Sequence, residues 1–222
     1  MRDYVEDLLG IFSDPEKYKE WYERHAMIYE DEKALVRSFY PKDCLDLGSG
    51  PAIFHEVMGG ETVSIDVSEP MLKSFQGDRV LGDVRALPFR DRSFKCTFSA
   101  VTVCFVDDLE SFFREMNRVT RERAIVCFIP LDSDWGSFYA ELGKRGHRYY
   151  SRAIFRPKAE ILEVFSKYFE IREVRSTLSF GPLEEARQES PTEGTVGSFI
   201  CVSGPPIIEP AARLSGGDLP DR

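Results

Sequence analysis

Three carboxylates follow short apolar runs in the first half of the chain. Asp46 lies just before a Gly-Ser-Gly turn in DCLDLGSGPAIF, Asp66 closes TVSID, and Asp83 ends RVLGD. In a doubly wound sheet, an acid about twenty residues beyond a glycine turn accepts hydrogen bonds from ribose hydroxyls. A further acid at the same edge can accept from an exocyclic amine such as adenine N6. The spacing therefore predicts a nucleoside site.

The glycine turn itself argues against a bound phosphate. Backbone N–H groups in such a turn usually cradle an anion at a helix N-terminus, but the Asp46 carboxylate would repel one. The turn also reads G-S-G-P-A-I, without the third glycine of the dinucleotide fingerprint. We therefore expect a ligand that approaches the backbone closely and carries positive charge beside Asp46.

Four longer segments carry a family resemblance. LDLGSGPA, VSIDVSEPML, GDVRALPFRDRSFKCTFSAVTVCFVDD and LESFFREMNRVTRERAIVCFIP follow one another in an order that resembles the class I S-adenosylmethionine-dependent methyltransferases. The resemblance runs from about Tyr18 to Gly204 and is closest to the small-molecule group similar to the ubiquinone/menaquinone-biosynthesis methyltransferases. It implies S-adenosylmethionine as the cofactor, whose ammonium and sulfonium groups tolerate a nearby carboxylate.

The resemblance also assigns residues to the parts of this cofactor. It implies that Asp46 and the glycine turn hold the methionine end, that Asp66 binds the ribose and that Asp83 contacts the adenine. The cofactor-binding residues that it implies are Tyr18, Tyr22, Asp46, Gly48, Ser49, Gly50, Asp66, Val67, Met71, Asp83, Val84 and Ala100. No metal site is expected, because the His and Cys residues lack ligand spacing.

The elements that must position these residues alternate between strand and helix. Seven strand-like runs (CLDLG, TVSID, RVLGD, KCTFSAV, AIVCFIP, EIREVRSTL and SFICVSG) alternate with helical segments such as AIFHEVM, PMLKSF, LESFFREMNRV and PKAEILEVFSKYF. The pattern predicts an α/β fold with a Rossmann-like, doubly wound seven-stranded sheet. No helix separates the last two strands, so we expect an antiparallel pair at the sheet edge.

Helical patterns also precede the first strand. An amphipathic helix, a second helix with a capping box at Ser13 and Glu16, and a third helix ended by Pro41 are predicted. The second helix carries an aromatic stripe, and relatives have a similar Tyr-x-x-Trp-aromatic segment that folds over the cofactor. We therefore expect residues 1–40 to form a helical lid over a domain of residues 41–205.

Two further segments have their own composition. Residues 131–156 form an insertion rich in aromatic residues, which we expect to close a substrate pocket above the strand ends. Residues 206–222 have the Pro, Gly and polar composition of a disordered tail.

Composition excludes several classes of protein. The chain has 222 residues and a formal net charge of −9, with no basic cluster, so nucleic acid is an unexpected partner. No apolar run spans a membrane and no signal peptide is recognised, so we expect a cytoplasmic location. The five cysteines suggest reduced core thiols rather than a disulfide framework.

The expected reaction is methyl transfer to a small organic acceptor. Where relatives often carry a His-His or Asn-His pair, this chain has Cys104-Phe105, so no catalytic residue is assigned. Candidates for a general base are Tyr22, His25, His147 and Tyr149. Two alternatives remain open at this point, an NAD-dependent oxidoreductase and a non-catalytic S-adenosylmethionine binder. The sequence leaves the acceptor and the oligomeric state unassigned.

Overall fold

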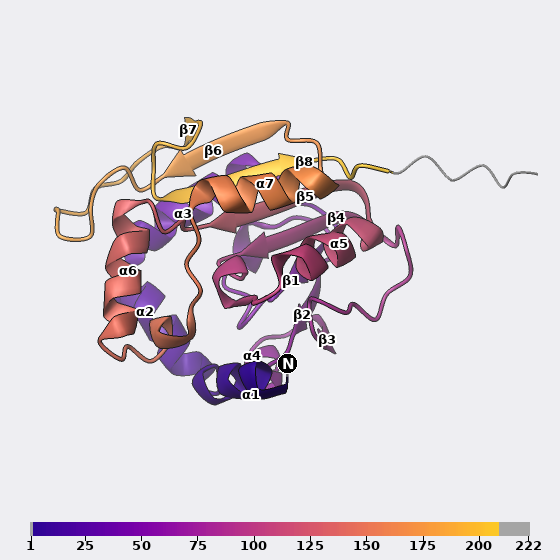
Figure 1. Ribbon diagram of the computed structural model, residues 1–222, viewed down its shortest axis with the longest axis horizontal. Helices are drawn as coiled ribbons and strands as arrows, with labels where there is room; N and C mark the ends of the chain where they lie inside the picture. The colour runs from indigo at the N-terminus through magenta and orange to yellow at the C-terminus, as the bar shows by residue number, and fades with distance from the viewer. Residues whose placement is uncertain (1, 209–222) are drawn as a thin grey trace, which may run out of the picture.

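An eight-stranded sheet forms the centre of the computed structural model, which describes residues 2–208 (Figure 1). The strand order is β3-β2-β1-β4-β5-β8-β6-β7. The first five strands are parallel, and β8 runs antiparallel to both of its neighbours, β5 and β6. The strands are β1 Cys44–Leu47, β2 Val63–Asp66, β3 Asp78–Leu81, β4 Phe94–Ala100, β5 Thr120–Phe128, β6 Glu173–Thr177, β7 Thr192–Glu193 and β8 Phe199–Gly204.

The α/β sheet prediction is confirmed, with one strand more than expected. Each of the seven strand-like runs contributes a strand, and the antiparallel pair is formed by β6 and β8. The additional strand, β7, has two residues and pairs with β6 at the outer edge. It lies in the polar loop between β6 and β8, where its two exposed residues show no strand pattern.

Helices cover both faces of the sheet. α5 (Leu109–Val119) and α7 (Lys158–Tyr168) pack in front of it in Figure 1, and α3 (Ala26–Ser38) packs behind. Side chains of β5 alternate between these layers, because successive residues of a strand point to opposite faces. Ala124, Val126 and Phe128 join the core beneath α5 and α7, whereas Ile125 and Cys127 join the core beneath α3.

The N-terminal segment divides into two parts. α1 (Arg2–Ile11) and α2 (Pro15–Arg24) lie outside the sheet layers, whereas α3 buries Leu35 and Val36 completely against the sheet. The predicted 1–40 unit is therefore not uniform, since its third helix is part of the core. The predicted capping box is wrong in detail, because the Asp14 side chain caps α2 by accepting from the Lys17 amide.

The helix predicted after the glycine turn is also wrong. Only a short 3₁₀ turn, η1 (His55–Val57), forms there, and the next α-helix is α4 (Glu69–Lys73). Ala52 adopts a left-handed φ of 59°, which is incompatible with a right-handed helix at this position. No α-helix N-terminus follows the turn directly, consistent with a ligand that has no phosphate there.

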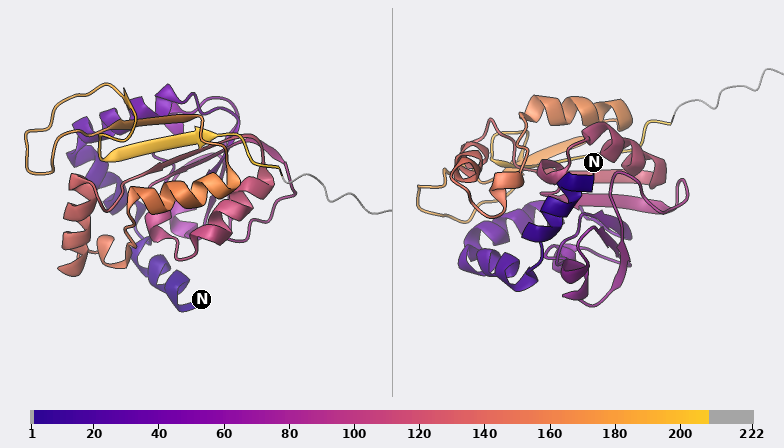
Figure 2. Two further views of the ribbon diagram at one scale, coloured as in Figure 1. Left: turned by 45° about the horizontal axis from the view of Figure 1, so that its top comes forward. Right: turned by 60° about the horizontal axis from the view of Figure 1, so that its bottom comes forward.

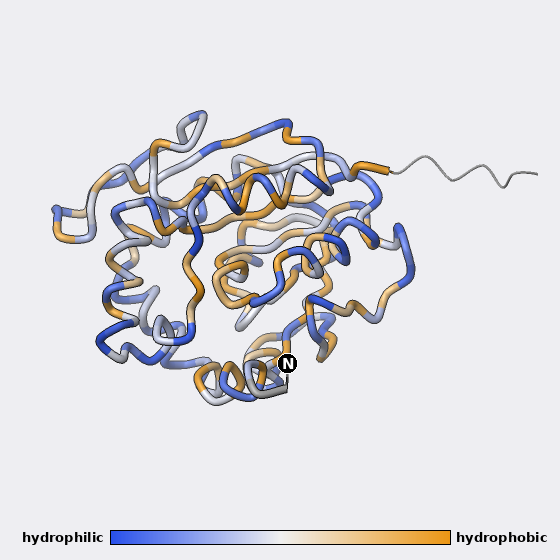
Figure 3. The backbone as a smooth tube through the Cα atoms, in the orientation of Figure 1, coloured by the Kyte–Doolittle hydropathy of each residue, from blue (hydrophilic) through white to orange (hydrophobic). Residues whose placement is uncertain are grey.

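The insertion adds α6 (Asp134–Lys144) and a 3₁₀ turn, η3 (Tyr150–Arg152). Figure 1 shows α6, α2 and α1 in an arc around one side of the sheet, and the right panel of Figure 2 brings α1 to the front. Hydrophobic and hydrophilic segments alternate along α1 in Figure 3, as in an amphipathic helix. Another 3₁₀ turn, η2 (Val103–Phe105), follows β4.

The cysteine prediction is wrong for four of the five residues. Cys44 and Cys96 form a disulfide between neighbouring positions of β1 and β4, and Cys127 and Cys201 form one between β5 and β8. The partners are 52 and 74 residues apart in sequence, so only the strand register brings them together. Cys104 is a buried free thiol, as expected.

The predicted disordered tail is contradicted at its beginning. The Ile207 amide donates to the Tyr168 carbonyl at 2.8 Å, and the Asn117 side chain donates to the Ile207 carbonyl at 3.2 Å. These bonds fix the chain against the end of α7. The remainder of that prediction, residues 209–222, lies outside the described residues. Among residues 2–208, no helix has the length and apolar character needed to cross a membrane.

Candidate functional site

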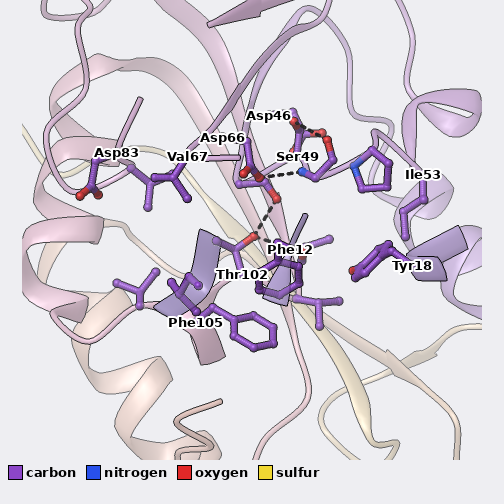
Figure 4. Close-up of a pocket in the computed structure, with 18 of the residues that line it drawn as sticks. Phe12, Tyr18, Asp46, Ser49, Ile53, Asp66, Val67, Asp83, Thr102 and Phe105 are labelled. Atoms are coloured by element: carbon purple, nitrogen blue, oxygen red, sulfur yellow. Dashed lines mark hydrogen bonds between the residues drawn. The ribbon is translucent and has the colours of Figure 1, made fainter. Parts of the chain in front are cut away.

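A pocket with an empty volume of about 920 Å³, which includes open solvent, lies where β1, β2 and β4 end and α1 passes over them. Figure 4 shows Asp46, Asp66 and Asp83 along one side and Phe12, Tyr18 and Phe105 along the other. Its lining also includes Tyr4, Val5 and Leu8 of α1, which the sequence did not indicate as site residues. The predicted residues that line it are Tyr18, Asp46, Gly48, Ser49, Gly50, Asp66, Val67, Asp83, Val84 and Ala100.

Two predicted cofactor residues lie outside this lining. Met71 is buried in α4 at 1% exposure, and its amide is bonded to the Ser68 hydroxyl. Tyr22 lines a neighbouring pocket instead. The pocket therefore gathers residues at the strand ends and in the loops after them, together with Tyr18 of α2, whereas Met71 of α4 and Tyr22 of α2 lie outside its lining.

Asp66 connects the turn after β1 to the start of α4. One carboxylate oxygen accepts from the Gly50 amide at 2.8 Å, and the other accepts from the Ser68 amide at 2.8 Å. Burial raises the pKa of Asp66 above its ordinary value, although these two N–H donors oppose that shift. Asp66 thus combines a structural role in the turn with a carboxylate at the pocket wall.

Asp46 is the most buried of the three acids, with 3% exposure. Its carboxylate lies 3.1 Å from Nε2 of His55, which also lies 3.2 Å from the Ser64 hydroxyl. Burial raises the pKa of Asp46, and the His55 hydrogen bond opposes the rise. His55 therefore orients Asp46, a role that its isolated position in the sequence did not reveal.

Asp83 is held by an arginine. Arg85 donates from Nη2 to the Asp83 carboxylate at 2.6 Å and also bonds to Asp107. Burial by itself would raise the pKa of Asp83, but the Arg85 hydrogen bonds outweigh it and the pKa lies below its ordinary value. Asp83 is thus ionised and fixed in orientation at the pocket edge.

Gly48 and Gly50 both have a positive φ, which favours glycine. A side chain would clash with the protein at Gly48, whereas at Gly50 it would extend into the pocket. Gly48 has a φ of +69°, and a Cβ at this position would lie 2.6 Å from Oγ1 of Thr102. Gly50 has a φ of +53°, but a Cβ there would meet no atom within 4 Å, since Gly50 borders the pocket. Thr102, whose hydroxyl lies 3.2 Å from the carbonyls of Leu47 and Gly48, was not predicted as a site residue.

Comparison with known proteins agrees with this geometry. Residues 45–128 match a family described as a methyltransferase domain. A solved S-adenosylmethionine-dependent methyltransferase from Thermotoga maritima, described as a possible histamine N-methyltransferase, matches with a TM-score of 0.80 and 25% identity, over 88% of this chain and 98% of that chain. The chain carries a class I S-adenosylmethionine-dependent methyltransferase domain.

Curated relatives of this methyltransferase domain match over shorter spans. An uncharacterized protein of Mycobacterium tuberculosis is 28% identical over 69% of this chain and 57% of its own length. A demethylmenaquinone methyltransferase of Roseiflexus castenholzii is 35% identical over 44% of this chain and 48% of its own length. The chain thus spans about half the length of these curated relatives. The cofactor of the family is S-adenosylmethionine, as the sequence predicted.

A second pocket of the methyltransferase adjoins the first. Both are lined by Tyr18, Val101 and Phe105. The second has an empty volume of about 610 Å³, including open solvent, and residues of the 131–156 insertion form part of its wall. Its lining residues are Tyr18, Trp21, Tyr22, Glu32, Val101, Cys104, Phe105, Ile129, Tyr139, Tyr149, Tyr150 and Phe155.

The four candidates for a general base separate into two groups. Tyr22 and Tyr149 line the second pocket, whereas His25 and His147 are absent from its lining. His25 stacks on Trp21, with ring centroids 4.3 Å apart, and His147 stacks on Tyr150 at 4.4 Å. Of the two candidates at the pocket, Tyr22 has a pKa well above its ordinary value, because the side chain is buried.

Cys104 also fails to provide a base. Burial raises the pKa of its thiol to about 12, so it remains protonated at neutral pH. The thiol donates a hydrogen bond to the Val101 carbonyl at 3.3 Å. Its packing agrees with the structural role expected from the sequence.

Glu32 is a pocket residue that the sequence interpretation missed. It lies in the charged stretch EDEK, which suggests a solvated helix face, yet it is only 3% exposed. A signal was present, because Ile28 and Leu35, four residues before and three after, mark the buried face of α3. Burial is the main cause that raises the pKa of Glu32 to about 8, and Asp31 adds to it.

Proposed function

We propose that this protein transfers the methyl group of S-adenosylmethionine to a small organic acceptor, with the cofactor in the first pocket and the acceptor in the second. The observation that carries the proposal is the shared wall of Tyr18, Val101 and Phe105. Two reactants that occupy adjoining pockets meet at that wall, as direct transfer between them requires.

The residues of the first pocket fit this cofactor part by part. Asp66 presents a carboxylate to the ribose hydroxyls, and Asp83 to the adenine amine. The open space over Gly50 and the buried Asp46 carboxylate suit the methionine end, which carries an ammonium group. The wall formed by α1 and Phe12 adds an apolar cover. The proposed cofactor set therefore retains the predicted residues of the lining and leaves out Met71 and Tyr22.

The chain contributes mainly by orientation and by exclusion of water. Bound S-adenosylmethionine supplies a methyl group activated by its sulfonium, and displacement at this carbon needs an in-line nucleophile. Aromatic side chains line the second pocket and restrict both the water content and the approach of the acceptor. No base is assigned among Tyr22, His25, His147 and Tyr149.

Ligand-dependent stability tests the cofactor assignment. Saturation with S-adenosylhomocysteine at one hundred times its Kd should stabilise the fold by about 2.7 kcal/mol, which raises the thermal midpoint by roughly 5–10 °C for a chain of this size. NAD at the same concentration should leave the midpoint unchanged, because Asp46 opposes its pyrophosphate. A shift with NAD and none with S-adenosylhomocysteine would overturn the proposal.

We also propose that α1 and α2 form a lid, whereas α3 belongs to the core. The lid contacts the insertion through polar groups near its surface: the Tyr4 hydroxyl donates to the Arg152 carbonyl at 3.1 Å, and Arg152 pairs with Asp7 at 3.3 Å. Exposed ion pairs of this kind contribute little stability. The lid also contacts the insertion through aromatic rings, with centroids 5.7 Å apart for Tyr18 and Tyr149 and 6.5 Å apart for Trp21 and Tyr139, and opening must separate both kinds of contact.

Hydrogen exchange provides a direct test of the lid. Saturating S-adenosylhomocysteine should slow amide exchange in residues 2–24, because a ligand that bridges α1 to the strand ends suppresses local opening. Exchange in α3 should change little, which makes it an internal control. Equal exchange of residues 2–24 with and without bound ligand would mean that these helices are docked permanently.

A further inference from the structure

The second pocket contains two polar groups that no protein atom satisfies. Among the described residues, Oε2 of Glu32 and the hydroxyl of Tyr149 are both buried and have no hydrogen-bond partner. Buried polar groups in native proteins are normally hydrogen-bonded, so each such exception calls for an explanation. Both groups line the same cavity, which suggests that a ligand satisfies them.

Aromatic rings from three parts of the chain surround this cavity. Ring centroids lie 5.5 Å apart for Tyr18 and Tyr22, 5.7 Å for Tyr18 and Tyr149, and 4.9 Å for Trp21 and Tyr22. Tyr139 of the insertion lies 6.5 Å from Trp21. Such rings present a negative face to a cation, and aromatic cages of this type bind organic ammonium groups.

The charge in the cavity has one sign. Glu32 is the sole acidic side chain in its lining, and within residues 2–208 no Lys, Arg or His side chain lines it. A buried carboxylate without a cationic partner is costly, so it either stays protonated or acquires a counter-ion. A ligand that carries an ammonium group would supply that counter-ion.

We propose that the acceptor of this methyltransferase is a small organic amine, bound as its ammonium form in the aromatic cage with Glu32 as its counter-ion. The ammonium proton then passes to the Glu32 carboxylate, which frees the nitrogen lone pair. The nitrogen attacks the methyl carbon as the bond from that carbon to the sulfonium breaks, and S-adenosylhomocysteine leaves. This inference rests on the proposed function, since it identifies the second pocket as the acceptor site. The Tyr149 hydroxyl provides a further hydrogen-bonding group for the polar end of the same ligand.

The experiment compares cations with neutral molecules of the same shape. Binding of tyramine and tyrosol, and of n-butylamine and 1-butanol, is measured by calorimetry on the S-adenosylhomocysteine complex at pH 8. At least one amine should bind ten times more tightly than its neutral partner. Tetramethylammonium serves as the smallest probe of the cage. If no cation binds more tightly than its neutral partner, the inference fails.

A neutral isostere isolates the role of Glu32. Glu32→Gln should weaken binding of the preferred amine at least tenfold and change binding of its neutral partner less than twofold. The variant should fold, because the wild-type carboxylate has no hydrogen-bond partner among the described residues that an amide would lose. Glu30→Gln, at an exposed position of the same helix, is the matched control and should change neither affinity. Unchanged amine binding in Glu32→Gln would overturn the proposal.

The pH dependence gives an independent readout. Since the pKa of Glu32 is raised to about 8, the carboxylate must lose a proton before it pairs with a cation. Amine affinity should therefore rise between pH 6 and 8 in the wild type, by up to tenfold per pH unit, and stay flat in Glu32→Gln. The same affinity slope in both proteins would contradict the assignment.

The other titratable groups near Glu32 do not account for the expected difference in the pH dependence of amine affinity between the wild type and Glu32→Gln. Burial raises the pKa values of Asp31, Cys104 and the tyrosines around Glu32, so the thiol and the phenols stay neutral from pH 6 to 8. His147, outside the lining, has a pKa lowered by burial. Its titration occurs in both proteins, so their difference reports Glu32. The surrounding titratable groups are Tyr18, Tyr22, Asp31, Cys104, Tyr139, His147, Tyr149 and Tyr150.

The failure of this inference can be told apart from failure of the proposed function. Binding of S-adenosylhomocysteine to the wild type is measured first. Its absence would contradict the cofactor assignment itself. Normal cofactor binding without a preference for cations would contradict only the amine acceptor.

Discussion

Asp66→Ala should lose roughly 10²–10⁴-fold in affinity for S-adenosylhomocysteine while it remains folded. A charged hydrogen bond contributes about 1.5–3 kcal/mol, and two ribose hydroxyls would then contribute roughly 3–6 kcal/mol, at about 1.4 kcal/mol per tenfold change. Calorimetry on the variant measures the loss. Asp78→Ala, at the exposed start of β3, is the control and should bind normally.

Asp66→Ala removes two kinds of interaction, the proposed contact with the ribose and the hydrogen bonds that hold the turn. Asp66 also accepts from the Gly50 and Ser68 amides, so its removal could weaken binding through the turn. A cofactor analogue that lacks the ribose hydroxyls resolves this in a double-mutant cycle. The analogue should bind poorly to the wild type but lose nothing further in Asp66→Ala. If the two losses simply add, Asp66 does not contact the ribose.

Gly48→Ala should lower stability far more than Gly50→Ala. Both residues have positive φ, which costs an L residue about 1–2 kcal/mol. At Gly48 the new methyl also overlaps the side chain of Thr102, and overpacking adds roughly 1–3 kcal/mol. Gly48→Ala should therefore lower the thermal midpoint by roughly 5–15 °C. At Gly50 the methyl enters the pocket, so the larger effect should be at least a tenfold loss of S-adenosylhomocysteine affinity.

Two further variants separate conformational strain from contact. Gly146→Ala introduces the same kind of strain, at a φ of +85° with no neighbour within 4 Å, outside the lining of both pockets. It should cost stability but leave cofactor affinity unchanged. Thr102→Ser removes a methyl that overlaps the new Cβ, so it should recover part of the midpoint lost in Gly48→Ala. Equal midpoints for Gly48→Ala and Gly50→Ala would show that Thr102 does not crowd the turn.

Local pattern was sufficient to predict the sheet and most of the first pocket. Each predicted strand is a short apolar run, and in a parallel sheet the residues that follow such runs meet at one edge. Asp46, Asp66 and Asp83 therefore come together although 37 residues separate the first from the last. The insertion was also recognisable, because its aromatic residues require cover from water.

Other features depend on which segments become neighbours. The cysteines are paired by strand register, and β8 lies between β5 and β6 because the long loop before it allows the chain to return. The Gly48 contact with Thr102 joins two loops that are distant in sequence. Nothing in the local composition of either loop specifies such a contact.

Glu32 illustrates the difference between what the local sequence determines and what the tertiary structure decides. The sequence by itself determined the strands, the ordered acids and the turn, because these follow from the periodicity and chemistry of short segments. Ile28 and Leu35 place Glu32 on the apolar face of its helix. Only the tertiary structure decided that its carboxylate lines a buried pocket, since α2, α3 and the insertion must pack together before water is excluded from it. Burial depends on the whole fold, and it is burial that turns an ordinary helix carboxylate into a candidate binding group.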